Sequence, residues 1–300
     1  MYATDSRGSR AAPYVPPTAL GARYRTGPTQ RWLVRFGYDG GNFHGWARQP
    51  GLRTVEGELR RGLGRHRISP TAEAADLRVA SRTDRGVSAR ANALTLRTDL
   101  PAEALLSALN GIAPDLFFDA ATPVGDAFRV RGAVSRTYRY FDPPRSQDLA
   151  RWRAGAALLT GAIDVRSFGR AVPSHRPVVR TVDSIRIERV GEGLRIDLTA
   201  PSFVWGMVRK LVAALREVDA GRLPLERLGA AAAGATRLTL PLAEPEALVL
   251  WDVAYPLAWP YRSPGPNRAQ VRWADASRAG LWTRTRLVEA LEDAGRSGSS

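Results

Sequence analysis

The predicted strands and helices of this chain run twice through one order: strand, helix, two strands, helix, strand. Apolar residues alternate in the strands, as Trp32, Val34 and Phe36 do, and recur every three or four residues in the helices. In the first half we expect strands at 32–38, 77–80, 91–97 and 126–131, and helices that begin after Thr54 and at Pro101. In the second half we expect strands at 135–141, 185–187, 194–198 and 247–255, and helices at 148–159, 204–218 and from Pro224.

This order is that of a split βαβ unit, the arrangement of RRM-like domains. We predict an α+β protein of two RRM-like halves whose sheets join edge to edge. The result would be one continuous, mixed but mainly antiparallel sheet with a central cleft. The predicted divisions are a flexible basic N-terminal arm at 1–29, an N-terminal half at 30–133, a C-terminal half at 134–258 and a helical C-terminal extension at 259–300.

Composition excludes several classes of protein. The chain has no cysteine, which excludes disulfides, thiolate metal sites and cysteine nucleophiles. The three histidines, His44, His66 and His175, lack the close spacing of a zinc site. The single lysine, Lys210, follows no glycine-rich turn, so a P-loop is excluded, and no metal or cofactor is expected. There is no apolar run of the ~20 residues that a membrane helix needs and no secretory signal, so we expect a cytoplasmic protein without membrane contact.

The net charge indicates the class of partner. The 44 basic residues outnumber the 29 acidic ones, which gives a net charge of +15. An excess of this size favours a polyanionic partner, because each phosphate that a protein neutralises releases counterions. A GC-rich genome would explain the use of arginine in place of lysine but not the net charge. Nucleic acid is therefore the favoured partner.

Residues 80–88 form a charged loop between two apolar strands, a place where a fold commonly presents functional groups. In this loop Asp84 lies between Arg82 and Arg85. Flanking arginines should keep the carboxylate ionised, which suits a nucleophile better than a general acid. The alternative is an Asp-Arg-Gly turn with a surface ion pair, and the loop by itself does not exclude it.

Two further positions carry polar groups in apolar surroundings. Arg209 lies beside the apolar stripe of its helix and therefore needs a carboxylate partner, unless it reaches the protein boundary. Its neighbour Lys210 points roughly 100° away and is expected in solvent. Tyr138 and Tyr140 share one face of their strand, with either base stacking or core packing as their role.

Four motifs, in order along the chain, resemble the TruA family of tRNA pseudouridine synthases. The first runs from Tyr38 to Pro50 (YDGGNFHGWARQP) and continues at 54–59 (TVEGEL), and the second is Arg82-Thr83-Asp84 with Gly86-Val87. The third is RTYRY at 136–140, and the fourth is Phe203 with Met207-Val208-Arg209. Ser81, Arg85 and Ser88 resemble an archaeal-type variant of the second motif. The resemblance covers roughly residues 31 to 255.

The resemblance implies a pseudouridine synthase fold with a central RNA-binding cleft, and an isomerase that converts uridine to pseudouridine in the anticodon stem-loop of tRNA. The target would be tRNA position 38, 39 or 40, or several of them, and the enzyme would be a homodimer without cofactor. Asp84 would attack the flipped uridine at its sugar or its base, Arg209 would orient Asp84, and Tyr138 would pack against the flipped ring. Arg82 would bind substrate, and the RNA-binding residues would be Asn42, His44, Trp46, Arg48 and Arg85.

The main alternative is a non-catalytic RNA-binding protein built from two RRM-like halves. It predicts aromatic consensus segments such as Gly-Phe-Gly-Phe-Val, which the chain lacks. A degenerate synthase would have lost Asp84 or Arg209, and both are present. A metal-dependent nuclease would need clustered carboxylates, whereas Asp39 and Asp84 are isolated in sequence.

Overall fold

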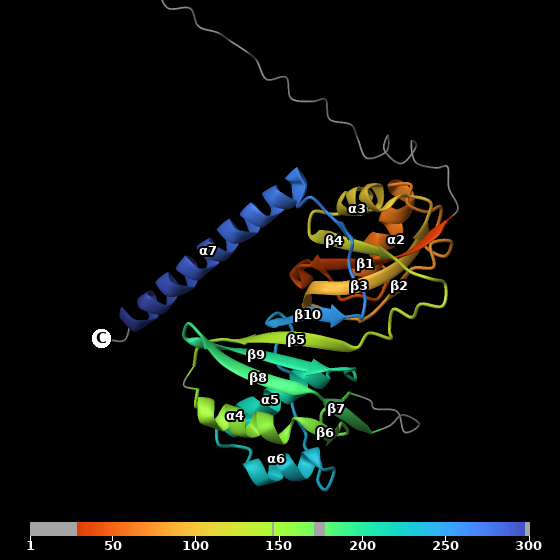
Figure 1. The fold of residues 1–300 in the computed structure, drawn as a ribbon. Helices are drawn as coiled ribbons and strands as arrows, with labels where there is room; N and C mark the ends of the chain where they lie inside the picture. Colours follow the sequence, from red (N-terminus) through yellow and green to blue (C-terminus); the bar gives the residue numbers. More distant parts are fainter. Residues whose placement is uncertain (1–28, 146, 171–177, 298–300) are drawn as a thin grey trace, which may run out of the picture.

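The computed structural model describes residues 29–145, 147–170 and 178–297 (Figure 1). Of the predicted basic arm at 1–29, residues 1–28 lie outside the described residues. The strands are β1 (Gln30–Tyr38), β2 (Arg78–Val79), β3 (Ser88–Thr98), β4 (Leu116–Pro123), β5 (Ser135–Asp142), β6 (Gly161–Asp164), β7 (Val179–Val182), β8 (Ser184–Val190), β9 (Gly193–Ala200), β10 (Leu248–Ala254) and β11 (Tyr261–Arg262). The helices are η1 (Gly40–Asn42), α2 (Val55–Arg65), α3 (Ala102–Asn110), α4 (Leu149–Leu158), α5 (Met207–Asp219), α6 (Leu225–Ala232) and α7 (Arg268–Ser297).

One mixed sheet runs through the molecule in the order β11-β4-β1-β3-β10-β5-β9-β8, with β2 paired to β3. The pairing of β10 with β3 is parallel, through Val249 with Ser88 and Leu250 with Ala89, and the other pairings of this sheet are antiparallel. The predicted α+β class and the continuous, mainly antiparallel sheet are therefore confirmed. The β3–β10 pairing is the edge at which strands from the first part of the chain meet strands from the second.

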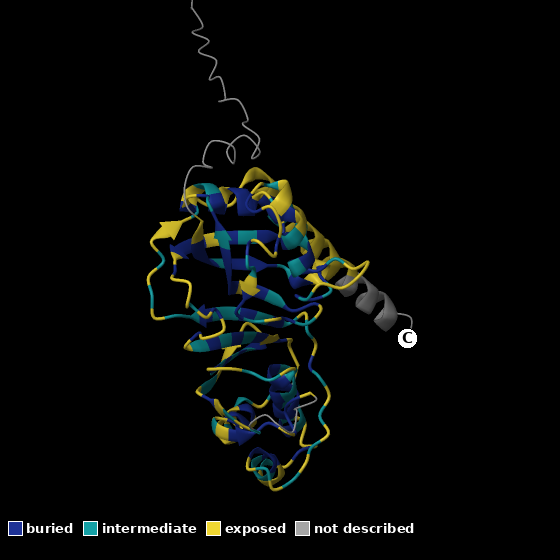
Figure 2. Cartoon of the chain, turned by 90° about the vertical axis from the view of Figure 1, so that its right-hand side faces the viewer, coloured by how far each residue is buried: buried dark blue, intermediate teal, exposed yellow. Residues whose placement is uncertain are grey.

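The helices form where the sequence pattern requires them. Thr54 caps α2 by accepting a hydrogen bond from the Gly57 amide, and the predicted apolar face of α2 (Val55, Leu59, Leu63) is fully buried. In α5 the predicted apolar positions Val208, Leu211, Leu215 and Val218 are likewise buried. Figure 2 shows the buried residues gathered in the strands and on the inner sides of these helices.

The predicted strand at 126–131 is wrong. The strand is β4 at 116–123, which pairs with β1 on one side and with β11 on the other. Phe118, Ala120 and Ala121 of β4 are buried, whereas Asp126 and Ala127 are exposed in the connection that follows. Asp119 and the short alanines give β4 a weak strand propensity, so its place is set by its neighbours in the sheet. The small β6–β7 sheet was also not predicted.

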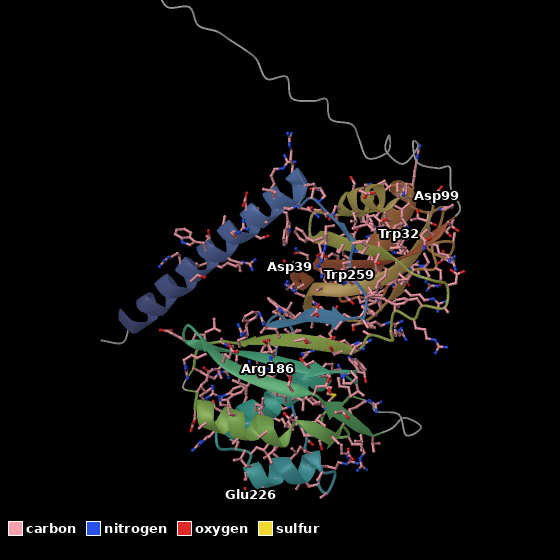
Figure 3. The ribbon with its side chains drawn as sticks, viewed as in Figure 1. Trp32, Asp39, Asp99, Arg186, Glu226 and Trp259 are labelled. Atoms are coloured by element: carbon pink, nitrogen blue, oxygen red, sulfur yellow. The ribbon has the colours of Figure 1, made fainter. Side chains whose placement is uncertain are left out.

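Helix α7 is anchored at its beginning and extends away from the sheet (Figure 1). The buried Gln270 amide donates hydrogen bonds to Asn110 Oδ1 and to the Leu116 carbonyl, and Trp273 packs against Phe117. Farther along, Leu281 and Trp282 are exposed. Figure 3 shows side chains projecting freely from this helix. Among the helices of the described residues, α7 included, none is long and apolar enough to cross a membrane.

The close approach of η1 to the loop before β3 generates a stability prediction. A Cβ at Gly40 would overlap the Val87 carbonyl and lie 2.8 Å from the Gly86 carbonyl carbon, both of them backbone atoms that cannot rotate away. We expect Gly40→Ala to lower the free energy of unfolding by about 1–3 kcal/mol, as overpacking does. Urea unfolding measures it, with Gly125→Ala as control, because a Cβ at Gly125 meets nothing within 4 Å. Equal stability of both variants would contradict a tight contact between these two backbone segments.

Candidate active site

An open cleft of about 1390 Å³ lies where the loop before β3 faces the beginning of α5. Besides that loop, its walls come mainly from residues 44–52, 201–209 and 245–248, together with Arg131, Arg136, Tyr138 and Arg170. The cleft therefore borders the β3–β10 junction. Asp84, Tyr138 and Arg209, three residues that sequence analysis singled out separately, all line it.

Each oxygen of the Asp84 carboxylate accepts a hydrogen bond from a different donor. Arg209 Nη1 lies 3.3 Å from Oδ2, and Trp205 Nε1 lies 3.0 Å from Oδ1. The Asp84 side chain remains 31% exposed, whereas the Arg209 side chain is 14% exposed. Arg209 thus has the carboxylate partner that its position in the helix required. The pair holds an ionised carboxylate in place and leaves part of it open to the cleft.

The backbone on both sides of Asp84 is fixed. The carbonyl of the buried Thr83 accepts a hydrogen bond from the Trp46 amide at 3.0 Å, and the Thr83 hydroxyl lies 2.7 Å from the Tyr38 hydroxyl. On the other side the Val87 amide donates to the Asp84 carbonyl, across a turn in which Gly86 has φ of 82°. Gly86 is needed there because residues with a Cβ rarely adopt this conformation. The loop is therefore a rigid support for the carboxylate.

Tyr138 forms part of the cleft wall beside Asp84. Its ring packs edge-on against Phe203, with centroids 5.3 Å apart and an interplanar angle of 89°. Burial raises the pKa of Tyr138 to about 12, so the phenol stays protonated at neutral pH. Tyr140, on the same strand face, is fully buried in the core. The shared face is confirmed: Tyr138 lies in the cleft wall, where it also packs in the core, and Tyr140 lies in the core.

A buried arginine lies beneath this wall. Arg136 is 7% exposed, and its guanidinium donates to Ser81 Oγ at 3.2 Å and to the Arg131 carbonyl at 2.8 Å. Burial lowers the pKa of Arg136, and the nearby charge of Arg131 lowers it further. Carbonyl acceptors thus hold a cation under the cleft. Such a charge favours anionic groups in the space above it.

Residues 243–246 connect the two partners of the ion pair. The Ala243 carbonyl accepts a hydrogen bond from Arg209 Nε. Glu244 accepts hydrogen bonds from Arg216, two turns farther along α5, and from the Tyr140 hydroxyl at 2.9 Å. The Glu246 carboxylate lies over Gly86, where an added Cβ would meet it at 3.0 Å. This segment therefore supports Arg209 and the Asp84 loop together.

The other predicted site residues divide by location. Arg82 and Arg85 are exposed and His44 is half-buried, and all three line the cleft. Trp46 also contributes to the cleft wall, but it is only 3% exposed and packs against Phe36, so it is mainly a core residue. Asn42 and Arg48 are exposed and are not among the residues that line the cleft.

Sequence analysis missed two residues of the site, Trp205 and Arg170. Trp205 is 54% exposed, and the Arg170 guanidinium carbon lies 4.1 Å from its ring centroid. A tryptophan in the loop immediately before an amphipathic helix was the available signal.

The expectation that Lys210 is solvated is wrong, because Nζ donates to the Gly169 carbonyl at 3.1 Å and to the Ser167 carbonyl at 3.4 Å. Burial lowers the pKa of Lys210, and the lysine tethers the segment that carries Arg170.

Across the described part of the chain, no group of three or more histidine, aspartate or glutamate side chains is arranged to hold a metal ion. The groups that the cleft offers to a substrate are the Asp84 carboxylate with its two donors, a second carboxylate at Glu246, a neutral phenol and several arginines.

Comparison with known proteins agrees with this arrangement. A family model described as tRNA pseudouridine synthase matches residues 156–256. The tRNA pseudouridine synthase A of Thermococcus gammatolerans is 39% identical over 228 residues, which is 74% of this chain and 84% of the relative. That of Natronomonas pharaonis is 39% identical over 269 residues, 82% of this chain and 96% of the relative. That of Methanosphaerula palustris is 33% identical over 268 residues, which is 88% of this chain and 94% of the relative.

The chain belongs to the tRNA pseudouridine synthase A (TruA) family. It is accordingly an isomerase that acts on tRNA and converts uridine to pseudouridine. The predicted family and enzyme class are confirmed.

The segment at 243–246 predicts a pH dependence of stability. The hydrogen bond from Arg216 is the main cause that lowers the pKa of Glu244 to about 2. Because this folded-state pKa lies below the unfolded value of about 4.3, the charged carboxylate stabilises the fold above pH ~4.3, and that contribution is lost as the pH falls toward 2. We expect Glu244→Gln to lower the urea midpoint at neutral pH. The difference from wild type should shrink progressively between about pH 5 and about pH 2. A stability difference between Glu244→Gln and wild type that does not change with pH would contradict this prediction.

Proposed function

We propose that Asp84 is the nucleophile of the isomerisation. The observation that carries this proposal is that both oxygens of a part-exposed carboxylate are held by fixed donors, Trp205 and Arg209, at the wall of a large cleft. A carboxylate held this way is ionised and oriented before the substrate arrives, so little reorganisation is needed during attack. A hydrolytic pair of carboxylates is not required, since the reaction rejoins the two fragments of its own substrate.

The target uridine must leave the base stack to reach Asp84. Tyr138, braced by Phe203, would then contact the flipped ring. Asp84 bonds either to the sugar carbon or to the base, and both routes use the same ionised oxygen. The bond between ribose and the ring nitrogen breaks, the uracil turns, and a bond from ribose to a ring carbon forms. That ring carbon then loses a proton, the former glycosidic nitrogen gains one, and the bond to Asp84 breaks, so the free carboxylate is regenerated and the product is an isomer of the substrate.

The proposed target lies in the anticodon stem-loop of tRNA, at position 38, 39 or 40 or at several of them. Support comes from the family motifs, together with the cationic surface that frames the cleft. Arg82, Arg85 and His44 would contact the strand that carries the uridine. Asn42 and Arg48, exposed nearby in sequence, would contact RNA outside the cleft. Trp46 would support the Asp84 loop through the hydrogen bond that its backbone amide donates to the Thr83 carbonyl.

Three further expectations belong to this proposal: that the enzyme is a homodimer, that it acts in the cytoplasm, and that residues 30–133 and 134–258 are its two working halves. The first rests on the family resemblance alone, and the second is the expectation drawn from the sequence above. The third is supported by the position of the cleft at the β3–β10 junction, where both halves contribute walls.

Replacing the nucleophile tests the mechanism. We expect Asp84→Asn to bind tRNA like wild type and to form pseudouridine at less than about one thousandth of the wild-type rate, as removal of a nucleophile does. Reverse-transcription stops after carbodiimide labelling measure the product and give the modified position. Asp275→Asn is the matched control, because it changes another exposed aspartate that is paired with an arginine, outside the cleft. Full activity of Asp84→Asn would overturn the mechanism, and binding without conversion by the wild type would favour a non-catalytic RNA-binding protein.

The two donors of Asp84 should matter unequally. Arg209 supplies a charge-assisted hydrogen bond worth about 1.5–3 kcal/mol, so Arg209→Ala should lower kcat roughly 10- to 100-fold. Trp205→Phe keeps the ring and removes one donor at a more exposed position, so its loss should stay below about tenfold. Single-turnover rates at saturating enzyme measure both effects. Wild-type kcat in Arg209→Ala would mean that this ion pair has no part in the reaction.

A further inference from the structure

The arginines of the described residues fall into two groups by their partners. Many form ion pairs with acidic residues, as Arg35 does with Asp119 and Arg139 with Asp197. Four exposed arginines at the cleft and beside it form neither ion pairs nor hydrogen bonds through their guanidinium groups, namely Arg82, Arg85, Arg129 and Arg131. Unpaired cations that gather in a cavity repel one another, and a bound anion removes that repulsion.

Two of these arginines connect the cleft to a second cavity. This side pocket has a volume of about 700 Å³ and is lined by 13 residues, of which Arg82 and Arg131 also line the cleft. Arg129 lies on the side-pocket side alone. The pocket is therefore an extension of the cleft, with guanidinium groups at the boundary between them.

The acidic residues of the side pocket are already engaged elsewhere. Asp126 pairs with Arg97, and Glu56 pairs with Arg60. The other two arginines that line the pocket, Arg31 and Arg78, both pair with Asp76. Arg82, Arg129 and Arg131 therefore carry charges that no acidic group of the described residues neutralises.

One part of the side-pocket wall is apolar, although charged side chains make up much of the rest. Leu77, Val79 and Val130 line it together with the half-buried Phe128, whose ring is braced by Tyr255 at 5.5 Å between centroids. An apolar patch beside convergent cations suits a ligand that has a flat apolar part and an anionic part. A nucleotide has both, because an unstacked base can pack on aromatic or guanidinium planes while its phosphate meets arginine.

We propose that the side pocket binds a second unstacked nucleotide of the tRNA, directly adjacent in the strand to the flipped uridine, with its phosphate on Arg129 and Arg131 and its base against Phe128. The inference rests on the proposed function in that the uridine occupies the cleft beside Asp84. Because Arg82 and Arg131 border both cavities, the phosphate between the two nucleotides lies at that shared border. The enzyme thereby recognises a dinucleotide that is open to flipping, and not the target uridine alone.

Equilibrium binding to an anticodon stem-loop RNA tests this proposal. Fluorescence anisotropy compares an intact loop with loops that carry one abasic nucleotide, placed before or after the target uridine. All proteins carry Asp84→Asn so that the RNA is not converted. Because anisotropy reports binding and not turnover, a failure of the proposed mechanism would appear as conversion of the RNA and would not imitate a failure of the pocket. The pocket variant is Arg129→Gln/Arg131→Gln, in which both changed side chains are exposed. The control is Arg227→Gln, an exposed and unpaired arginine next to Glu226, far from the cleft (Figure 3).

We expect the pocket variant to bind the intact loop about tenfold more weakly at ~0.1 M salt and to show a smaller salt dependence, while the control binds like the parent. One of the two abasic loops should bind the parent protein more weakly than the intact loop does. The pocket variant should lose little further affinity for that abasic loop, because base and phosphate occupy the same pocket. The proposal is overturned if the pocket variant binds the intact loop like the control, if neither abasic loop binds more weakly, or if the abasic loss is equally large in the pocket variant.

Discussion

The parallel pairing of β3 with β10 is the contact on which the candidate site depends. It consists of two residue pairs, Val249 with Ser88 and Leu250 with Ala89. Ser88 follows the Asp84 loop by one short turn, and Val249 follows the 243–246 segment that supports Arg209. A short pairing at this edge therefore sets the distance between a carboxylate and a guanidinium that lie 125 residues apart in sequence. Gly40, packed against Val87, holds the same loop from its other side.

The arginines of the fold differ in whether they have acidic partners. Arginines away from the cleft mostly have acidic partners, which limits the repulsion expected of a chain with a net charge of +15. Around the side pocket the acidic groups are engaged, and several arginines there form no ion pair. A folded RNA supplies the missing negative charge. The arginines at the cleft and its side pocket thus remain available to substrate.

Asp84 illustrates why tertiary context decides chemistry. Between Arg82 and Arg85 in the sequence it resembled a surface turn as much as a nucleophile. In the fold neither neighbour is its partner; Arg209 and Trp205 are. The positions of Tyr138 and Tyr140 are likewise distinguished only in the fold. Strand periodicity places both on one face, and packing then buries Tyr140 in the core and leaves Tyr138 at the cleft.

The sequence by itself determined the features that depend on local periodicity and on motifs: the order of most strands and helices, the Thr54 cap, the buried stripe of α5, the need of Arg209 for a carboxylate and the family. Tertiary structure alone decided β4 in place of 126–131, the tethering of Lys210, the burial of Trp46, the role of Trp205 and the side pocket. The physical reason is range. Alternation and helical spacing act over a few residues and can be read from the chain, whereas sheet neighbours and hydrogen-bond partners are chosen by packing among segments that meet only in the folded protein.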